Sequence, residues 1–303
     1  MLAPVVLFVY NRYEHTKRTV EALAQNYLAK ETLLYIFSDG PKSEKDFDSI
    51  YKVRGFLDSL GSIKDNFKDV VIEHAPSNKG LANSVIYGVT KIIETHKKVI
   101  VLEDDLLVTP DFLNFMNDSL NFYYNEKSIW SISGFNIPIK MPRSYNHDVY
   151  LSLRSSSWGW ATWIDRWNTI TWEESDYLQY IKQKKKLKAF NLGGRDLSRM
   201  LIAQINNEID SWAVKWCFNQ FLQKKYTIYP VKSKVNNIGT DGSGTHGYID
   251  YQKIYRTHAQ EYQQFLSLPQ LNKKILKRFR NHYLSFYAYL IIRIKSTVKN
   301  AIR

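Results

Sequence analysis

Three adjacent carboxylates are the feature of this sequence best suited to chemistry. Glu103, Asp104 and Asp105 directly follow the apolar run at residues 99–102. Like charges this close repel one another unless a cation neutralises them, and Mg²⁺ and Mn²⁺ prefer oxygen ligands. Because Mg²⁺ usually takes one or two protein carboxylates beside phosphate oxygens and water, the triplet indicates a seat for a metal and a diphosphate. The alternative is a solvated acidic turn that also caps the helix after it.

The elements that must position these acids follow from hydropathy. Short apolar runs predict buried strands at residues 4–10, 33–37, 70–72, 99–102 and 129–132. Apolar residues at helical spacing predict helices at residues 16–28, 50–60, 81–96 and 110–124. This alternation predicts an α/β fold, with a mostly parallel sheet and helices on both faces. Such sheets bind ligands beyond the carboxyl ends of their strands, which is where the acids lie.

After residue 135 the alternation stops. Residues 137–147 are rich in Pro, Asn and Ser and predict a loop, whereas residues 155–163, SSSWGWATW, form an aromatic cluster. The basic run at residues 182–188 is more typical of a solvated helix face than of a binding patch. Residues 208–222 predict a further helix, and residues 236–247 a glycine-rich flexible loop.

The segment VLEDDLLVTPDFLNF, residues 101–115, resembles the metal-binding strand and following helix of GT-A glycosyltransferases. The sequence is most similar to the N-acetylglucosaminyltransferase I type and to bacterial family 2-like sugar transferases. The resemblance extends to about residue 255 and is carried by several short motifs in the same order. It implies a GT-A fold that uses a UDP-sugar donor. It divides the chain into a nucleotide-sugar part (1–135), an acceptor and catalytic part (136–255) and a basic helical tail (256–303).

The resemblance also implies roles for the donor residues. Asp105 is expected to bind Mn²⁺ (or Mg²⁺) bridging the donor diphosphate, with Asp104 near the ribose and Glu103 near the transferred sugar. Arg12, in VVLFVYNRYEHTKRTVEAL, is expected to meet the nucleotide phosphate or base. Asp39, in the turn Ser-Asp-Gly, is expected to accept the uracil N–H, although it is also an ordinary turn residue.

Two further segments match the donor side of the family. Asn78, Lys79 and Gly80 resemble the N-x-G loop beside the base, where glycine permits a backbone turn into a helix N-terminus. The sequence lacks the histidine that the eukaryotic enzyme type has there. The aromatic cluster resembles the Gly-Trp segment lining the donor sugar. In that reading Gly159 allows close approach and Trp158 or Trp160 stacks on a sugar; the alternative is a set of buried tryptophans.

An inverting transfer needs one general base, and the D-x-W segment at residues 208–213 matches the family's. Asp210 is the expected base, with Trp212 beside it as an apolar wall that raises the carboxylate pKa. The alternative is an ordinary acid at a helix start, and Glu173, Glu174 and Asp176 are reserve candidates. The segment VNNIGTDGSGTHG is similar to a lid over the donor. Its His246 completes the metal shell or touches the diphosphate, unless it is structural.

The net charge of +13 is concentrated near the end of the chain. Residues 268–303 hold nine Lys or Arg and no acid. Basic residues flanking the apolar stretch at 283–292 fit an interfacial helix, so residues 271–303 are expected to meet an anionic membrane surface. The alternative is a helix packed on the catalytic domain. One cysteine excludes a disulfide framework, and no apolar run reaches membrane-spanning length. With no signal-peptide pattern at residues 1–12, we expect a cytoplasmic protein, peripheral on the inner face of the membrane.

These features predict a metal-dependent inverting glycosyltransferase. Its expected acceptor is a lipid-linked saccharide in bacterial surface polysaccharide synthesis. A nucleotidyltransferase is an alternative, but it usually has a glycine-rich phosphate loop after the first strand, where VYNRYEHTK has no glycine. A nucleic-acid-binding protein is disfavoured because the charge is confined to the tail. A non-catalytic carbohydrate-binding protein is a further alternative, and it needs neither Asp105 nor Asp210.

Overall fold

The structure is a computed structural model of the 303-residue chain. It describes residues 1–239, 241 and 268–283, except for the side chains of residues 174 and 176. His246, most of the expected lid and residues 284–303 lie outside the described residues.

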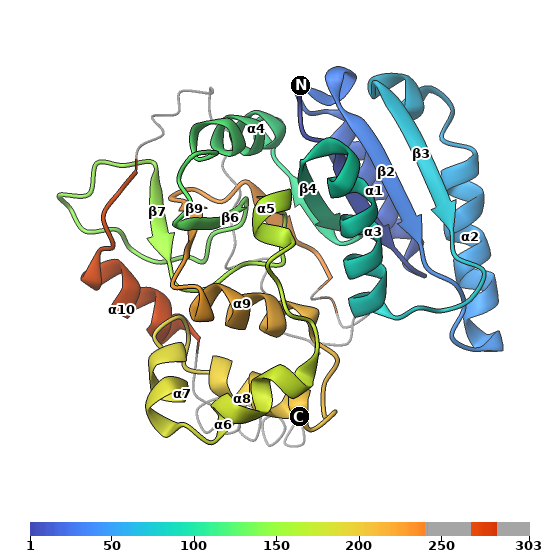
Figure 1. Cartoon of the computed structure of the whole chain (residues 1–303). Coiled ribbons are helices and arrows are strands. Elements are labelled where there is room, and N and C mark those ends of the chain that lie inside the picture. The colour runs from blue at the N-terminus through green and yellow to red at the C-terminus, as the bar shows by residue number, and fades with distance from the viewer. Residues whose placement is uncertain (240, 242–267, 284–303) are drawn as a thin grey trace, which may run out of the picture.

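An eight-stranded mixed sheet, in the order β3-β2-β1-β4-β8-β6-β9-β7, forms the centre of the molecule (Figure 1). Its first half is wholly parallel and consists of β1 (Val5–Val9), β2 (Leu33–Ser38), β3 (Asp69–His74) and β4 (Lys98–Glu103). Its second half consists of β6 (Ile129–Ser133), β7 (Val149–Ser152), β8 (Trp160–Trp163) and β9 (Tyr226–Pro230), with both parallel and antiparallel pairs. The predicted α/β fold class is confirmed.

Helices cover the parallel half as the alternation predicts. They are α1 (Tyr13–Ala24), α2 (Phe47–Asp58) and α3 (Leu81–His96), whereas α4 (Phe112–Phe122) packs against β6 and β8 of the second half. In Figure 1, α3 lies on one face of this half, and α1 and α2 lie on the other. Short 3₁₀ turns complete the connections at Ala29–Glu31, Glu44–Asp46 and Gly61–Asn66.

The second half holds its helices in a group beside the sheet. They are α5 (Ile164–Trp167), α6 (Leu178–Ile181), α7 (Lys184–Phe190), α8 (Leu197–Ile205) and α9 (Trp212–Leu222), and a 3₁₀ turn at Glu174–Tyr177 precedes α6. The predicted helix at 208–222 begins later, at Trp212, so Asp210 lies before the helix and not in its first turn. Residues from α6 to α9 share a separate apolar cluster centred on Phe190, Leu201 and Phe218.

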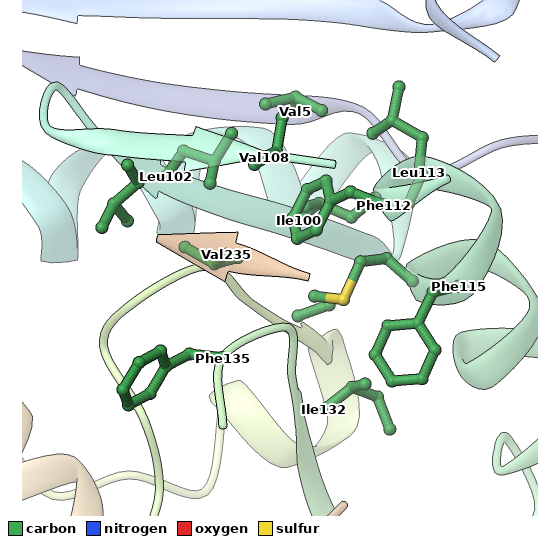
Figure 2. Close-up of a cluster of buried hydrophobic side chains, with 14 of the residues drawn as sticks. Val5, Ile100, Leu102, Val108, Phe112, Leu113, Phe115, Ile132, Phe135 and Val235 are labelled. Carbon is green, nitrogen blue, oxygen red and sulfur yellow. The ribbon is translucent and has the colours of Figure 1, made fainter. Parts of the chain in front are cut away.

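A two-stranded antiparallel ribbon connects the two halves. It pairs β5 (Leu106–Val108), directly after the acidic triplet, with β10 (Val235–Asn237). The first residues of the expected flexible loop are therefore a strand. Figure 2 shows Val235 of this ribbon among core side chains that include Leu102, Val108 and Phe112, so the ribbon packs on the same core as β4.

The described part of the tail is α10 (Lys273–His282), capped by the Asn272 side chain, which accepts from the backbone N–H groups of residues 274 and 275. Ile275 and Phe279 are buried, and the Phe279 ring lies 5.2 Å from that of Tyr229. This segment therefore packs on the sheet, as in the alternative considered for the tail. Among the helices of the described residues, none is long and apolar enough to cross a bilayer.

Candidate active site

Arg12 and two of the acids form the centre of the site. Arg12 follows β1, and the acids follow β4, its parallel neighbour in the sheet. The Arg12 guanidinium donates to Asp104 Oδ1 and, at 2.8 Å, to Asp105 Oδ2. Thr19 of α1 donates to the backbone carbonyl of Asp104 at 2.8 Å, which fixes the turn between β4 and β5. The structure thus brings together the predicted residues Arg12, Asp104 and Asp105.

Burial makes negative charge costly here. It raises the pKa of Glu103 to about 8, with the charges of Asp105 and Asp104 adding to the effect. Burial also raises the pKa of Asp104 to about 6, although the Arg12 charge opposes this shift. Burial alone would lower the Arg12 pKa, yet the two carboxylates raise it above its usual value. A carboxylate cluster under this strain gains free energy from a nearby cation, since opposite charge favours the ionised form.

The segment after β10 lies directly against these side chains. The Ile238 N–H donates to the Asp105 carbonyl at 2.8 Å, and a Cβ on Gly239 would overlap Asp105 Oδ2. His15 of α1 lies 3.3 Å from the Ile238 carbonyl oxygen and 3.2 Å from Asp241 Oδ2. Sequence reasoning missed His15 and Gly239. The signal for Gly239 was its place in the glycine-rich segment, whereas His15 carries no local signal.

In the second part of the site, the Asp39 carboxylate accepts four hydrogen bonds. Its Oδ1 accepts from the backbone N–H groups of Gly40 and Lys79, both at 2.8 Å. Its Oδ2 accepts from Asn78 Nδ2 at 3.1 Å and from the Gly80 N–H at 3.0 Å. A carboxylate offers about four lone-pair positions, so these four donors occupy its acceptor capacity. Asp39 therefore organises the Asn78–Gly80 loop in this structure, a function that the sequence analysis did not consider.

Arg54 of α2 fixes this loop from behind and was also missed. Its Nη2 donates to the backbone carbonyls of Asp39 at 3.2 Å and Ala75 at 2.7 Å, which ties the end of β2 to the end of β3. From helical spacing alone, Arg54 is predicted to be an ordinary exposed cation. No local pattern shows that its guanidinium meets the backbone carbonyls of Asp39 and Ala75.

Asp210, the expected base, lies beside the same loop. A Cβ built on Gly80 would be 3.8 Å from Asp210 Oδ2, so the carboxylate faces the loop although it is 130 positions away in sequence. Asp210 is exposed. Ser211 after it donates its backbone N–H to Gln204 Oε1 at 2.6 Å, which anchors the approach to α9. Glu173, a reserve candidate, is also exposed.

The aromatic cluster differs from expectation at Trp160. This residue begins β8, is 0% exposed and packs with Trp130, Trp167, Trp212 and Trp216. It has no free ring face, so stacking of Trp160 on a sugar is corrected to a core role. Its indole packs 5.3 Å from that of Trp212, and Trp212 follows Asp210 by two positions. Trp160 therefore supports the segment that carries the expected base.

Trp158 and Gly159 directly precede β8. Trp158 is half-buried, with its ring 4.6 Å from that of Phe135. Gly159 has φ +63°, and a Cβ there would lie 2.7 Å from Val235 Cγ2 of β10. The close approach that glycine allows at this position is therefore to the β5–β10 ribbon.

The described residues gather no set of three or more His, Cys, Asp or Glu side chains suited to a metal ion. The Asp104–Asp105 pair still fits Mg²⁺ or Mn²⁺, because these ions take one or two protein carboxylates and complete their shell with phosphate and water. The closely packed Arg12 also fits a diphosphate, since guanidinium groups bind phosphate oxygens.

Comparison with known proteins gives the family. The model of the GNT-I family matches residues 1–201, about two thirds of the chain, including Arg12, the Asp39 loop and all three acids. The chain belongs to the GNT-I family. This GNT-I family chain is 24% identical over 261 residues to alpha-1,3-mannosyl-glycoprotein 2-beta-N-acetylglucosaminyltransferase of Arabidopsis thaliana. The match covers 80% of this chain and 56% of the relative, so the chain spans about half the length of that protein.

Two solved structures of S. aureus TarS are also similar to this chain. The crystal structure of residues 1–349 has a TM-score of 0.44 at 11% identity, covering 80% of this chain and 62% of that one. The second crystal structure has a TM-score of 0.43 at 10% identity, covering 80% and 37%.

Proposed function

We propose that this GNT-I family chain is a glycosyltransferase that moves a sugar from a UDP-sugar to a saccharide acceptor. The observation that carries the proposal is the meeting of two groups at the carboxyl ends of the parallel strands. One is the cation–carboxylate cluster of Arg12, Asp104 and Asp105. The other is the loop organised by Asp39, with Asp210 facing it. Parallel α/β sheets bind nucleotides at this edge.

The donor is proposed to lie between these groups. In register, Val9 pairs with Ser38 on one side, and Phe8 pairs with Glu103 on the other. The turns after β2 and β4 therefore flank the end of β1 and are about 10 Å apart, two strand spacings. That span suits a nucleoside diphosphate with its base near the Asp39 loop and its phosphates near Arg12. In this proposal Asp39 acts by holding the Asn78–Gly80 backbone.

A divalent cation is proposed to be held by Asp105, with Asp104 beside it. When bound, Mn²⁺ or Mg²⁺ would neutralise the charge that develops on the leaving diphosphate. The chain's own contribution is to keep two carboxylates in place through Arg12 and Thr19, and to cover them with the Ile238–Gly239 backbone. The glycine at position 239 leaves no side chain between this backbone and Asp105.

Asp210 is proposed to act as the general base. The acceptor hydroxyl oxygen forms a bond to the anomeric carbon while the bond from that carbon to the diphosphate oxygen breaks, with inversion. The hydroxyl proton goes to the Asp210 carboxylate, and UDP leaves with the bonding electron pair. An exposed carboxylate facing the donor loop is reachable by an acceptor from solvent.

The acceptor is proposed to be lipid-linked, in the synthesis of a bacterial surface polysaccharide at the inner face of the cell membrane. Its support is the basic character of residues 268–303 together with the exposed lysines of α10, Lys273, Lys274 and Lys277. An enzyme near an anionic surface meets a membrane-bound acceptor at higher local concentration.

Calorimetric titration of UDP tests the donor site, first with Mn²⁺ and then with EDTA. We expect binding with Mn²⁺ that EDTA and Asp105→Ala both abolish, while Asp65→Ala, an exposed acid on a 3₁₀ turn, binds as the wild type does. Absence of UDP binding to the wild type with Mn²⁺ present contradicts the proposal. Binding followed by no transfer or hydrolysis of any UDP-sugar would instead favour a carbohydrate-binding protein.

A further inference from the structure

A second surface gathers cations from two segments far apart in sequence. The helices α7 and α10 lie near each other at one side of the molecule (Figure 1). Arg195, between α7 and α8, donates to Asn281 Oδ1 of α10 at 2.6 Å. A Cβ on Gly194 would lie 3.5 Å from Tyr283 Cβ, so the two segments are in contact. The basic run at 182–188, which alone indicates a solvated helix face, thus adjoins the basic tail.

Most of the exposed side chains of these segments are positive. We call them the basic face: Lys182, Lys184, Lys185, Lys186, Lys188, Arg195, Arg199, Lys273, Lys274, Lys277 and Arg278. Within residues 182–200 and 268–283 the only acid is Asp196, and it is engaged by Arg154 at 2.8 Å. These segments therefore carry a large excess of positive charge.

The placement of the lysines opposes helix stability. Lys184, Lys185 and Lys186 occupy the first turn of α7, and Lys273 and Lys274 that of α10, with no acid in either turn. The amino end of a helix carries partial positive charge, so cations there are unfavourable. Two neighbouring helices with the same unfavourable arrangement indicate that the charges serve an interaction with something outside the chain.

The chemistry of the face favours a lipid surface over a nucleic acid. Two apolar side chains, Leu178 and Leu192, are 47% and 42% exposed on the same group of helices. Cations with exposed leucines suit the interface of an anionic bilayer, where charge attracts and short apolar groups enter the headgroup layer. The apolar side of α10 is not available for insertion, because Ile275 and Phe279 are buried against the sheet.

We propose that the basic face formed by α7, the start of α8 and α10 docks this protein on anionic phospholipid, with the folded domain lying on the bilayer. The attraction is mainly electrostatic, and α10 stays packed on the sheet. This inference deepens the proposed function, since a lipid-linked acceptor requires the enzyme at the membrane. It extends the contact beyond the tail to a segment that no sequence pattern assigns to a membrane.

Co-sedimentation of the full chain with phosphatidylcholine vesicles, with and without phosphatidylglycerol, tests this proposal. One variant carries Lys184→Glu, Lys185→Glu and Lys188→Glu on α7. A second carries Lys273→Glu, Lys274→Glu and Lys277→Glu on α10. A matched control reverses three exposed lysines of the parallel half, Lys30, Lys45 and Lys68. Each cation near an anionic surface contributes about fivefold to affinity, so each face variant should bind at least about tenfold more weakly than the control.

Thermal melts separate a docking defect from a folding defect. Four of the six substitutions place glutamate in the first turn of a helix, where it is favourable, and Lys188 and Lys277 are exposed, so the melting temperature of each variant should stay close to that of the wild type. An α7 variant that binds vesicles as tightly as the control overturns the proposal, since the tail alone then accounts for binding. Equal binding to vesicles without phosphatidylglycerol, or binding to poly(U) but not to vesicles, overturns it as well. The assay contains no donor or acceptor, so failure of UDP binding would be seen separately by calorimetry.

Discussion

In the half of the sheet formed by β1–β4, polar side chains reach the site because each follows the end of a buried parallel strand. Arg12, Asp39 and Asp104 all lie within three residues of such an end. In the half formed by β6–β9, the expected base reaches the site through long-range packing. Asp210 follows no strand, and it is held by a tryptophan cluster and by the Gln204–Ser211 contact.

One site is therefore positioned in two ways, by backbone topology and by side-chain packing. Backbone topology fixes the donor side, so its geometry depends on turns and on residues such as Gly80. Side-chain packing fixes the base side, so its geometry depends on the volume of buried rings.

The largest effect is expected for Asp210→Asn. The variant keeps the shape of the side chain but cannot accept the acceptor proton, so kcat should fall by about 10²- to 10⁴-fold. UDP affinity with Mn²⁺ should be unchanged, because the donor side is supported separately. Single-turnover rates and UDP calorimetry on the same preparation check both statements. If Asp210→Asn keeps its activity and Glu173→Gln loses a similar factor in kcat, Glu173 is the general base instead.

Trp160→Ala should test the packing that holds the base side. Removing a fully buried indole from the core costs about 3–5 kcal/mol in the free energy of unfolding. Trp158→Ala, at a half-buried position, should cost clearly less. Urea denaturation followed by circular dichroism measures both. Equal costs would contradict the larger contribution expected from the fully buried Trp160.

Gly80→Ala should test the backbone on the donor side. Gly80 has φ +76° and ψ 157°, a region that essentially only glycine adopts, so alanine should cost about 1–3 kcal/mol. The matched control is Gly55→Ala in α2, where nothing lies within 4 Å of the new Cβ. There the same change should stabilise by about 0.5–1 kcal/mol, because alanine is the better helix former. A control that destabilises as much as Gly80→Ala contradicts the backbone explanation.

The smallest effect is expected at His96, which ends α3 behind the site. Burial lowers its pKa below the ordinary value of 6.5, and Tyr35 OH lies 3.0 Å from its Nε2. The unfolded chain therefore binds a proton more readily than the folded one, so His96 reduces stability as pH falls below 6.5. In His96→Gln the loss of stability on acidification should be smaller than in the wild type. If the free energy of unfolding falls equally with pH in both proteins, His96 does not contribute to the acid sensitivity.

The contrast between backbone topology and long-range packing also explains which features could be predicted from the sequence. The strands β1–β4 and helix α3 are predicted almost at their bounds because continuous apolar runs and helical spacing are local signals. The strand β8 was not predicted, because its residues belong to the aromatic segment 155–163. Sequence does not distinguish a tryptophan that stacks on a ligand from one that packs in the core. Three of the four donors on Asp39 and the Arg54 bonds come from distant segments, so no local pattern reveals them.

All eight tryptophans lie between residues 130 and 216, and five of them share one buried cluster, with ring centroids as close as 4.4 Å. The tryptophan fluorescence of the molecule therefore originates entirely in the base-side half. Emission on unfolding reports the tryptophan cluster and the side chains packed on it, such as Phe8 of β1 and Val85 of α3, whereas circular dichroism reports the whole sheet. Because Trp212 is two residues from Asp210, an acceptor arriving at the expected base can be followed optically without any attached label.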